Sequence, residues 1–243
     1  MDKKKRLVLI GGGGHCGSVL DAARGMNRFE EIVITDPDIE AGSEYMGCRV
    51  AGTDEMLSRL FQDGFGMAFV SVGSITSTRL RKELCQKAKE AGFDFPNIID
   101  PSAKVSEYAA VGKGIFIGKN AVVNAGARIG DMAIINTGAV VEHGCRIGAF
   151  SHVSVGAVMC GDSKTGDSVF VGANATVIQG VRIGMNSIIG AGSVVLKDVG
   201  PDSMFYRSGG VKFKNAFPTD MEQWFWGSSV KRLRSWDGRM EAC

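Results

Sequence analysis

Long apolar runs are absent from this 243-residue sequence, and so is any large excess of charge of one sign. No stretch approaches the roughly 18 apolar residues that a membrane-spanning helix needs. The apolar run at residues 7–10 ends at four glycines and is too short for a signal peptide. We therefore expect a cytoplasmic protein that has no membrane as a partner. The formal net charge of +2 gives no reason to expect nucleic acid as a general partner either.

Paired cysteines are absent too. The six cysteines form no CxxC pair, which argues against a zinc site and against a disulfide framework, so we expect no metal. In a reducing compartment, scattered cysteines are typical of free thiols that pack as small apolar residues. Glycine is the residue in excess, because 34 of the 243 residues are glycine, twice the usual share of ~7 %.

The first part of the chain alternates between strand and helix patterns. Apolar, β-branched segments that end at a glycine or a turn predict strands, and the segments between them have helical composition. The expected strands are residues 6–10, 32–35 and 68–72, and the expected helices are residues 15–25, 56–65 and 77–91. This order predicts a parallel sheet with right-handed crossovers, that is, a Rossmann-like α/β domain over residues 1–98.

From Val105 onward the sequence repeats every six residues. Stepping in sixes from Val105 to Val195 reaches sixteen positions, of which fourteen are Val or Ile. Thirteen of the sixteen have Ala, Ser or Cys two residues earlier, and eight are followed by Gly. Such a register is an internal repeat. It puts one large side chain inside each face of a prism, and the small residues and glycines suit the corners.

The pattern of Ile or Val, then Gly, then four variable residues resembles the hexapeptide-repeat acyltransferases. The resemblance implies a left-handed parallel β-helix over residues 99–198, with three hexads per coil and roughly five coils. It also implies a homotrimer with sites between adjacent prisms, although a solenoid that serves only as a scaffold is the alternative. Residues 199–243 leave the repeat and are rich in aromatic and basic residues. We expect this tail to cap the β-helix, with a role in holding coenzyme A as the alternative.

The three histidines all lie in informative segments. Residues 136–143, Asn-Thr-Gly-Ala-Val-Val-Glu-His, and residues 151–157, Ser-His-Val-Ser-Val-Gly-Ala, closely resemble the NeuD-type branch of the hexapeptide acyltransferases. That branch includes N-acetyltransferases acting on UDP-4-amino-4,6-dideoxy sugars, as in the bacillosamine pathway. The resemblance extends over both parts of the chain, from Leu7 to about Lys197.

The resemblance implies roles for individual residues. His143 matches the general base of the family, and an ordinary imidazole, with a pKa of about 6.5, is mostly neutral in the cytosol. Asn136 matches an asparagine that faces the acceptor, and the N–H of Gly161 matches the group that binds the thioester oxygen. Acetyl-CoA is the expected cosubstrate, with no tightly bound cofactor. The residues that match further acetyl-CoA contacts are His152, Ala173 and Ala191.

One departure from the family concerns the residue after the base. Relatives often have Asp or Glu there, whereas this chain has Gly144. Glu142 is the remaining catalytic candidate, although neighbours in an extended strand point to opposite sides. Either the imidazole lacks an orienting carboxylate or another subunit supplies one. The alternative to the role of base is that His143 is an ordinary surface histidine. Because His143 and His152 are nine residues apart, half of an eighteen-residue coil, a site that uses both needs two chains.

The glycine-rich segment after the first expected strand reads Gly12-x-Gly14-x-x-Gly17, and Asp36 lies nineteen residues beyond Gly17. Alone this is a dinucleotide fingerprint, but only about three strands are expected and no nicotinamide half is visible. The loop provides backbone N–H groups at a helix N-terminus for a phosphate. The resemblance assigns it to a nucleotide-sugar, with a purely structural turn as the alternative. The matching residues are Gly13, Gly14 and His15 at the sugar or diphosphate, Thr35 and Asp36 at the nucleoside, and Gly73 beside it.

Together these features predict an acetyl-CoA-dependent N-acetyltransferase that acts on the 4-amino group of a UDP-4-amino-4,6-dideoxy sugar. Transfer is expected to be direct, because both substrates can meet in one cleft. The alternative enzyme functions are O-acetylation of a free sugar such as sialic acid and N-acetylation of a dTDP- or GDP-amino sugar. The alternative outside catalysis is a nucleotide-binding scaffold trimer.

Overall fold

The computed structural model describes residues 5–206, so the predictions for residues 207–243 lie outside the described residues. The described residues belong to one compact unit, Met1–Arg207. The domain bounds at residues 98 and 198 stay a prediction. Within residues 5–206 no helix is both long enough and apolar enough to cross a membrane.

The N-terminal part is an α/β domain built on a five-stranded sheet in the order β3-β4-β2-β1-β5. All neighbouring strands in it run parallel except β3, which is antiparallel to β4. The strands are β1 (Lys5–Ile10), β2 (Phe29–Thr35), β3 (Glu44–Tyr45), β4 (Cys48–Gly52) and β5 (Met67–Val70). The helices are α1 (Gly14–Gly25), the 3-10 turn η1 (Asp54–Met56), α2 (Leu57–Gln62) and α3 (Arg79–Glu90).

The sheet has two strands more than the sequence predicts. β3 and β4 form a hairpin whose turn residues, Met46 and Gly47, both have positive φ, +50° and +66°, as a two-residue hairpin turn requires. The helix predicted at 56–65 is also too long, because α2 ends at Gln62, two residues before Gly64 at φ +93°. A glycine in the left-handed region commonly marks the end of a helix.

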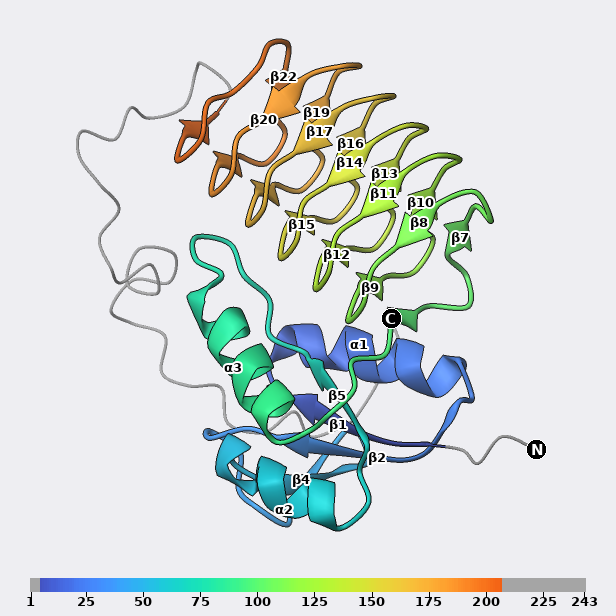
Figure 1. Ribbon diagram of the computed structural model, residues 1–243, viewed down its shortest axis with the longest axis vertical. Coiled ribbons are helices and arrows are strands. Elements are labelled where there is room, and N and C mark those ends of the chain that lie inside the picture. Colours follow the sequence, from blue (N-terminus) through green and yellow to red (C-terminus); the bar gives the residue numbers. More distant parts are fainter. Residues whose placement is uncertain (1–4, 207–243) are drawn as a thin grey trace, which may run out of the picture. The chain divides into compact units, whose positions relative to one another are not determined.

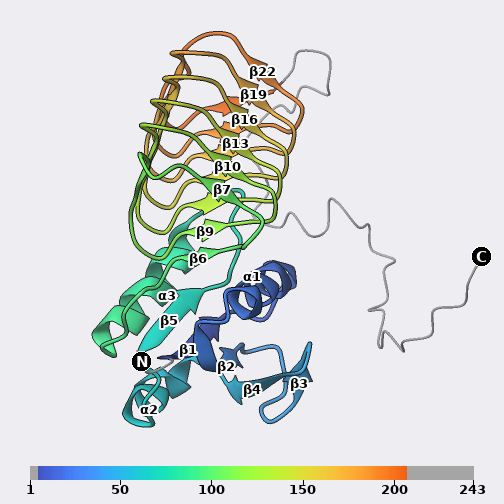
Figure 2. The same cartoon turned by 90° about the vertical axis from the view of Figure 1, so that its right-hand side faces the viewer.

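The second part is a parallel β-helix with three faces, consistent with the predicted left-handed form (Figure 2). From β6 to β22 the two-residue strands pair in register with the strand eighteen residues later, as Val123 does with Val141, so a coil takes three hexads; the last pair, β21 with β23, is sixteen residues apart. Face 1 consists of β7 (Lys104–Val105), β10 (Val122–Val123), β13 (Val140–Val141), β16 (Val158–Met159), β19 (Thr176–Val177) and β22 (Val194–Val195). Face 2 consists of β8 (Ala110–Val111), β11 (Arg128–Ile129), β14 (Arg146–Ile147), β17 (Lys164–Thr165) and β20 (Arg182–Ile183). Face 3 consists of β6 (Ile98–Ile99), β9 (Phe116–Ile117), β12 (Ile134–Ile135), β15 (His152–Val153), β18 (Phe170–Val171), β21 (Ile188–Ile189) and β23 (Met204–Phe205).

The second residue of each strand points into the prism. The sixteen positions that the six-residue step predicts are the second residues of β7 to β22, and all except Val105 and Val111 are buried. Burying one Val or Ile side chain contributes roughly 1.5–3 kcal/mol, so the repeating column is the main source of stability of the β-helix. The predicted hexapeptide repeat is therefore confirmed.

The α/β part packs against face 3, where α1 lies beside the first coils (Figure 1). The outer residues of the first three strands of this face, Ile98, Phe116 and Ile134, are buried in one cluster with Val19 and Leu20 of α1. The loop after β5 continues over β15. This packing brings the carboxyl ends of the parallel strands next to the β-helix, and carboxyl ends are where α/β sheets bind ligands.

Candidate active site

The glycine loop and the strand ends around it enclose a cavity of about 350 Å³. The loop leaves β1 through Gly11, whose φ of +102° and close approach to Val72 exclude a side chain. Gly13 and Gly14 have no atom within 4 Å of the position of a Cβ, so the backbone is open there. All six residues predicted to bind a nucleotide-sugar line this cavity: Gly13, Gly14, His15, Thr35, Asp36 and Gly73.

Asp36 ties the glycine loop to the turn after β2. Its Oδ2 accepts a hydrogen bond from the N–H of Gly12 at 2.6 Å, and its Oδ1 accepts one from the N–H of Asp38 at 2.8 Å. Both oxygens of the carboxylate therefore stabilise the loop, unlike the acidic residue of a dinucleotide fold, which binds ribose hydroxyls. Thr35 is buried, and its hydroxyl has no partner among the residues that the structure describes. A buried hydroxyl facing a cavity is available to a ligand.

A second cavity, of about 440 Å³, adjoins the first at His15 and Gly73. It lies between the α/β part and the β-helix, and its lining includes Asn136 and His152. The His15 ring contacts Phe116 edge-on, with the ring centroids 5.1 Å apart, and lies 6.4 Å from the His152 ring. The two cavities together lead from Thr35 and Asp36 to Asn136, at the edge between faces 3 and 1.

His152 is held by hydrogen bonds on both ring nitrogens. Its Nδ1 lies 3.1 Å from the carbonyl oxygen of Ser74, which only accepts, so Nδ1 carries the proton. Its Nε2 therefore accepts from Nδ2 of Asn136 at 3.2 Å. Oδ1 of Asn136 in turn accepts from the N–H of Thr137 at 2.8 Å, which fixes the amide orientation. Ser74 was not among the predicted site residues, although its place after Gly73, beyond the end of a parallel strand, is a signal for a role in binding.

The buried His152 and the largely buried His15 are both neutral at ordinary pH. Burial lowers the pKa of His152 to about 4, with the hydrogen bond to Ser74 opposing the shift and the charge of Arg81 adding to it. Burial, together with the charges of His152 and Arg81, lowers the pKa of His15 to about 3. Nε2 of His15 is buried and has no hydrogen-bond partner within residues 5–206. Nε2 of His15 can therefore form a hydrogen bond with a ligand, whereas both nitrogens of His152 already have partners. Neither ring is a base suited to neutral pH.

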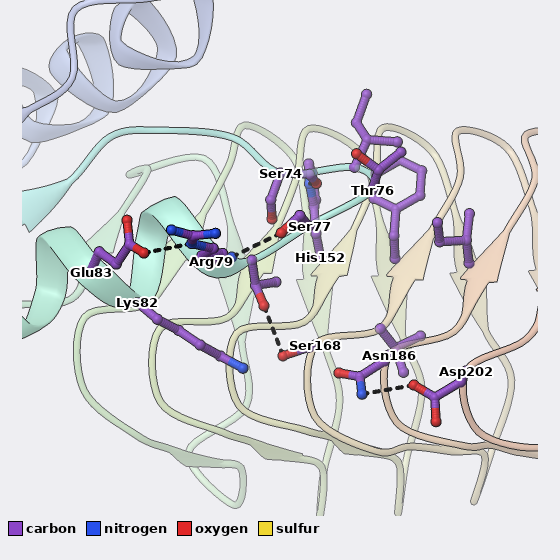
Figure 3. Close-up of a pocket in the computed structure, with 15 residues that line it drawn as sticks. Ser74, Thr76, Ser77, Arg79, Lys82, Glu83, His152, Ser168, Asn186 and Asp202 are labelled. Atoms are coloured by element: carbon purple, nitrogen blue, oxygen red, sulfur yellow. Dashed lines mark hydrogen bonds and ion pairs between the residues drawn. The ribbon is translucent and has the colours of Figure 1, made fainter. Parts of the chain in front are cut away.

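A third cavity, also of about 440 Å³, lies on the other side of the loop after β5 (Figure 3). The start of α3 and the outer surface of face 3 form its walls. Thr78 Oγ1 donates to Ser168 Oγ at 3.0 Å, and Asn186 Nδ2 donates to Asp202 Oδ1 at 3.0 Å. Of the predicted site residues, only His152 lines this cavity. It extends the open space along face 3 beyond the His152 network.

His143 lies elsewhere, on the turn that joins β13 of face 1 to β14 of face 2. The side chain is exposed, and its ring lies against Gly161, where a Cβ would come within 2.6 Å of Cε1. Glu142 does not contact the ring through its carboxylate, since Oε2 accepts from the backbone N–H of His143 at 3.1 Å. The structure therefore places His143 and Gly161 together, and it uses Glu142 to hold the backbone of the turn.

The predicted residues thus fall on two edges of the β-helix. Asn136, Ala173 and Ala191 lie on turns between faces 3 and 1, with Ala173 two coils and Ala191 three coils beyond Asn136, whereas His143 and Gly161 lie on turns between faces 1 and 2. One chain therefore does not bring His143 to Asn136 or to the acetyl-CoA positions Ala173 and Ala191. This arrangement is what the nine-residue spacing of His143 and His152 leads us to expect.

Comparisons with protein-family models agree with the two-part architecture. The model described as PglD N-terminal domain matches residues 6–88. Models described as a hexapeptide repeat of succinyl-transferase and as a bacterial transferase hexapeptide match residues 108–143 and 162–197. A comparison with curated proteins gave no match.

Solved structures similar to this chain cover almost its entire described length. A histidine-to-alanine mutant of GDP-perosamine N-acetyl transferase from Caulobacter crescentus, in complex with CoA and GDP-perosamine, is 36 % identical with a TM-score of 0.78, covering 87 % of this chain and 99 % of that one. The acetyltransferase domain of PglB from Neisseria gonorrhoeae, in complex with acetyl coenzyme A, is 34 % identical with a TM-score of 0.78, covering 84 % and 97 %. WeeI from Acinetobacter baumannii, at 15 % identity and a TM-score of 0.69 over 84 % and 98 %, shares the fold.

Proposed function

The chain belongs to the NeuD/PglD-type family of hexapeptide-repeat sugar N-acetyltransferases and is an acetyl-CoA-dependent acyltransferase, and from this premise we propose its acceptor and its base. The acceptor is the 4-amino group of a UDP-4-amino-4,6-dideoxy sugar, and the base is His143. The observation that carries the proposal is the pair of adjoining cavities, which leads from Thr35 and Asp36, past His15, to Asn136.

The cavities suit a ligand with a nucleoside, a diphosphate and a sugar in that order. The glycine loop offers backbone N–H groups and the start of α1 to the diphosphate. The unpartnered hydroxyl of Thr35 lies at one end, and the amide of Asn136, oriented by Thr137 and His152, lies at the other. A free sugar would leave the first cavity empty, which favours a nucleotide-linked acceptor over sialic acid.

The chemistry needs one base and one oxyanion donor. The amine nitrogen attacks the thioester carbonyl, the C–N bond forms, and the imidazole of His143 takes the amine proton. The carbonyl oxygen then carries negative charge, which the N–H of Gly161 stabilises. This N–H makes no hydrogen bond with any group in residues 5–206, so it is available. The C–S bond breaks as the tetrahedral intermediate collapses, and the proton passes from the imidazolium to the departing thiolate of CoA.

Completing this site needs two chains, and we assign it to a homotrimer. Four of the six outer residues of face 1 are valines, namely Val122, Val140, Val158 and Val194, and Val194 is 52 % exposed; Thr176 interrupts this column and Lys104 begins it. Three prisms with this face turned towards a common axis would bury the column. The edge that carries His143 and Gly161 in one subunit would then meet the edge that carries Asn136 in the next.

A second acceptor class has support from a specific comparison. The relative at 36 % identity is a GDP-perosamine N-acetyl transferase, which favours a GDP-linked amino sugar as the alternative to a UDP-linked one. The carboxylate oxygens of Asp36 bond to backbone N–H groups of the glycine loop and of the turn after β2, so they give no ground for choosing between the two nucleotides. The choice between a UDP-linked and a GDP-linked acceptor therefore rests on how the uracil or guanine ring fits near Thr35.

The test measures CoA release with acetyl-CoA and matched acceptors. UDP-, GDP- and dTDP-linked 4-amino-4,6-dideoxy sugars are compared with the same nucleotide-sugars carrying a 4-hydroxyl. We expect turnover with the UDP-linked amine, none with its 4-hydroxyl analogue, and loss of turnover in His143→Ala. Turnover with the GDP-linked amine alone selects the second candidate. Absence of turnover with every nucleotide amino sugar would refute the proposed function.

A further inference from the structure

The candidate base lies on a turn where no acidic residue follows it in the sequence and the carboxylate that precedes it is bonded to the backbone. A neutral histidine that must take a proton works best when a second group accepts the N–H of its other nitrogen, because that bond fixes the tautomer and stabilises the imidazolium. Residue 144 is glycine, and the carboxylate of Glu142 bonds to the backbone N–H of His143. A partner for the ring has to come from another coil.

The space beside residue 144 is already occupied by a carboxylate. A Cβ on Gly144 would lie 2.1 Å from Oδ1 of Asp162, and Gly144 has a φ of +68°. No side chain fits at residue 144 while Asp162 keeps this position. The corner therefore holds one acidic side chain, and it comes from the coil after the one that carries His143.

Asp162 and His143 are linked through the backbone, and their side chains reach towards each other's coil. The N–H of Asp162 donates to the carbonyl of His143 at 2.9 Å. The ring of His143 extends forward over Gly161, while the carboxylate of Asp162 extends back over Gly144. Residues 143 and 144 are neighbours in one turn, and residues 161 and 162 are neighbours in the next. The ring and the carboxylate thus occupy adjacent positions on the same corner.

The carboxylate of Asp162 is also free, unlike comparable aspartates of the β-helix. Asp131 accepts from the N–H of Lys113 at 2.9 Å, and Asp167 accepts from the N–H of Ala149 at 2.8 Å, each joining its turn to the preceding coil. The exposed carboxylate of Asp162 makes no hydrogen bond or ion pair with residues 5–206. It is therefore not needed to hold the turn to which it belongs.

The charge of Asp162 acts on this corner. Burial is the main cause that raises the pKa of the Cys145 thiol, and the nearby charge of Asp162 raises it further. Cys145 follows Gly144 directly, so the carboxylate acts electrostatically on the turn of the candidate base. The charged side chains on the two turns and on the strands that leave them are Glu142, Asp162, Arg146 and Lys164.

We propose that Asp162 is the positioning residue for His143: its carboxylate accepts the Nδ1–H of the imidazole and directs the Nε2 lone pair at the acceptor amine. The proposal rests on the proposed function, since it gives His143 the role of base. It makes the carboxylate part of the same subunit as the base, without any contribution from a neighbouring chain.

The test is Asp162→Asn, assayed in the full chain with the acceptor that turns over. Asparagine tolerates the left-handed backbone that Asp162 adopts at φ +59°, so the variant should fold. We expect kcat to fall at least about 10-fold with little change in KM for acetyl-CoA. We also expect the acidic limb of the kcat/KM profile to move to lower pH by roughly half a unit or more. The control is Asp167→Asn, which removes the same charge from the same coil on a different turn and should leave both readouts unchanged.

A second readout does not depend on activity. The ring of His143 can be titrated by nuclear magnetic resonance in the free protein, because the other two histidines have pKa values of about 3 and 4. Asp162→Asn should move the titration midpoint of the His143 ring to lower pH. If midpoint and pH profile both match the wild type while His143→Ala is inactive, the role of Asp162 is overturned and the proposed function stands. If His143→Ala keeps full turnover, the assignment of the base fails instead.

Discussion

The imidazole of His143 lies against the Cα of Gly161, one coil further along the β-helix. A Cβ at residue 161 would come within 2.6 Å of Cε1 and 2.7 Å of Nε2 of the ring. Gly161 has no positive φ, so its backbone would accept any residue and the requirement for glycine is one of space. The pairing brings the candidate base and the candidate oxyanion donor into contact within one chain.

Substituting Gly161→Ala should therefore disable the reaction without unfolding the protein. The methyl group would push the imidazole off the turn, and we expect kcat to fall roughly 100-fold, equivalent to about 2.7 kcal/mol of transition-state stabilisation. Steady-state kinetics and a thermal melt measure the two effects. The control is Gly66→Ala, where nothing lies within 4 Å of the Cβ position. Wild-type kcat in Gly161→Ala would show that the ring need not occupy its present place.

Complementation between two inactive variants tests whether sites are shared. His143 lies on an edge between faces 1 and 2, and His152 lies on face 3 beside the other edge of face 1. Mixed in equal amounts, His143→Ala and His152→Ala chains should give about a quarter of the wild-type number of complete sites in random trimers, because each site needs one intact contribution from each neighbour. Native mass spectrometry confirms the exchange. Exchanged trimers that stay inactive contradict a site between subunits.

The repeat allowed the β-helix to be predicted in detail from sequence because its register is purely local. A β-branched residue every six positions fixes which side chains enter the core, and Val123 and Val141 pair as the eighteen-residue coil requires. The order of strand, glycine loop and helix was equally predictable, since β1 ends at Ile10 and α1 begins at Gly14; that the loop binds an anion stays a prediction. The hairpin at Met46 and Gly47 was missed because β3 has only two residues, too few to show alternation, although β4 has five.

What the sequence could not give is the contact between distant segments. Ser74 orients His152 from 78 residues away, and Asp162 fills the space beside Gly144 from the next coil. Neither contact leaves a periodic or local signal, because each depends on how one element packs on another. The sequence showed that Gly144 departs from the family, which often has an acidic residue there. Only the stacked coils show that the carboxylate of Asp162 lies beside it and leaves no room for a side chain at residue 144.

Arg81 should be the main polar tie between α3 and the β-helix. Arg81 is 3 % exposed, and its guanidinium donates to the carbonyl oxygens of Phe150, at 3.1 Å, and Met132. Arg81→Met keeps much of the volume but leaves both carbonyls without their donor, so we expect the free energy of unfolding to fall by about 2–4 kcal/mol in urea titrations. The control on the same helix is Arg79→Met, whose charge is exposed and paired with Glu83. If the two variants have the same free energy of unfolding, the buried hydrogen bonds of Arg81 make no net contribution to stability.

The two buried histidines should make stability depend on pH below neutrality. The pKa values of His15 and His152 are lowered in the folded protein to about 3 and about 4, whereas in the unfolded chain each is about 6.5. Between these limits the unfolded state binds a proton that the folded state excludes, so the free energy of unfolding rises with pH. Above pH 6.5 the two rings are mostly neutral in both states and cost little stability. As the pH falls towards 4, protonation of the unfolded chain lowers the free energy of unfolding increasingly. At pH 5 each ring should lower the free energy of unfolding by up to about 2 kcal/mol relative to pH 7.5.

A comparison with His152→Asn isolates this contribution from the carboxylates, which titrate in both proteins. The variant cannot gain a proton at residue 152 in either state, so its free energy of unfolding should fall less between pH 7.5 and pH 5 than that of the wild type. Urea titrations at pH 5, 7.5 and 8.5 give the slopes, and the difference between the two proteins should be constant from pH 7.5 to 8.5. Parallel curves down to pH 5 would mean that His152 is protonated as readily in the folded protein as in the unfolded chain. The hydrogen bond from Asn136 to Nε2 could not then persist, because a protonated ring nitrogen has no lone pair to accept it.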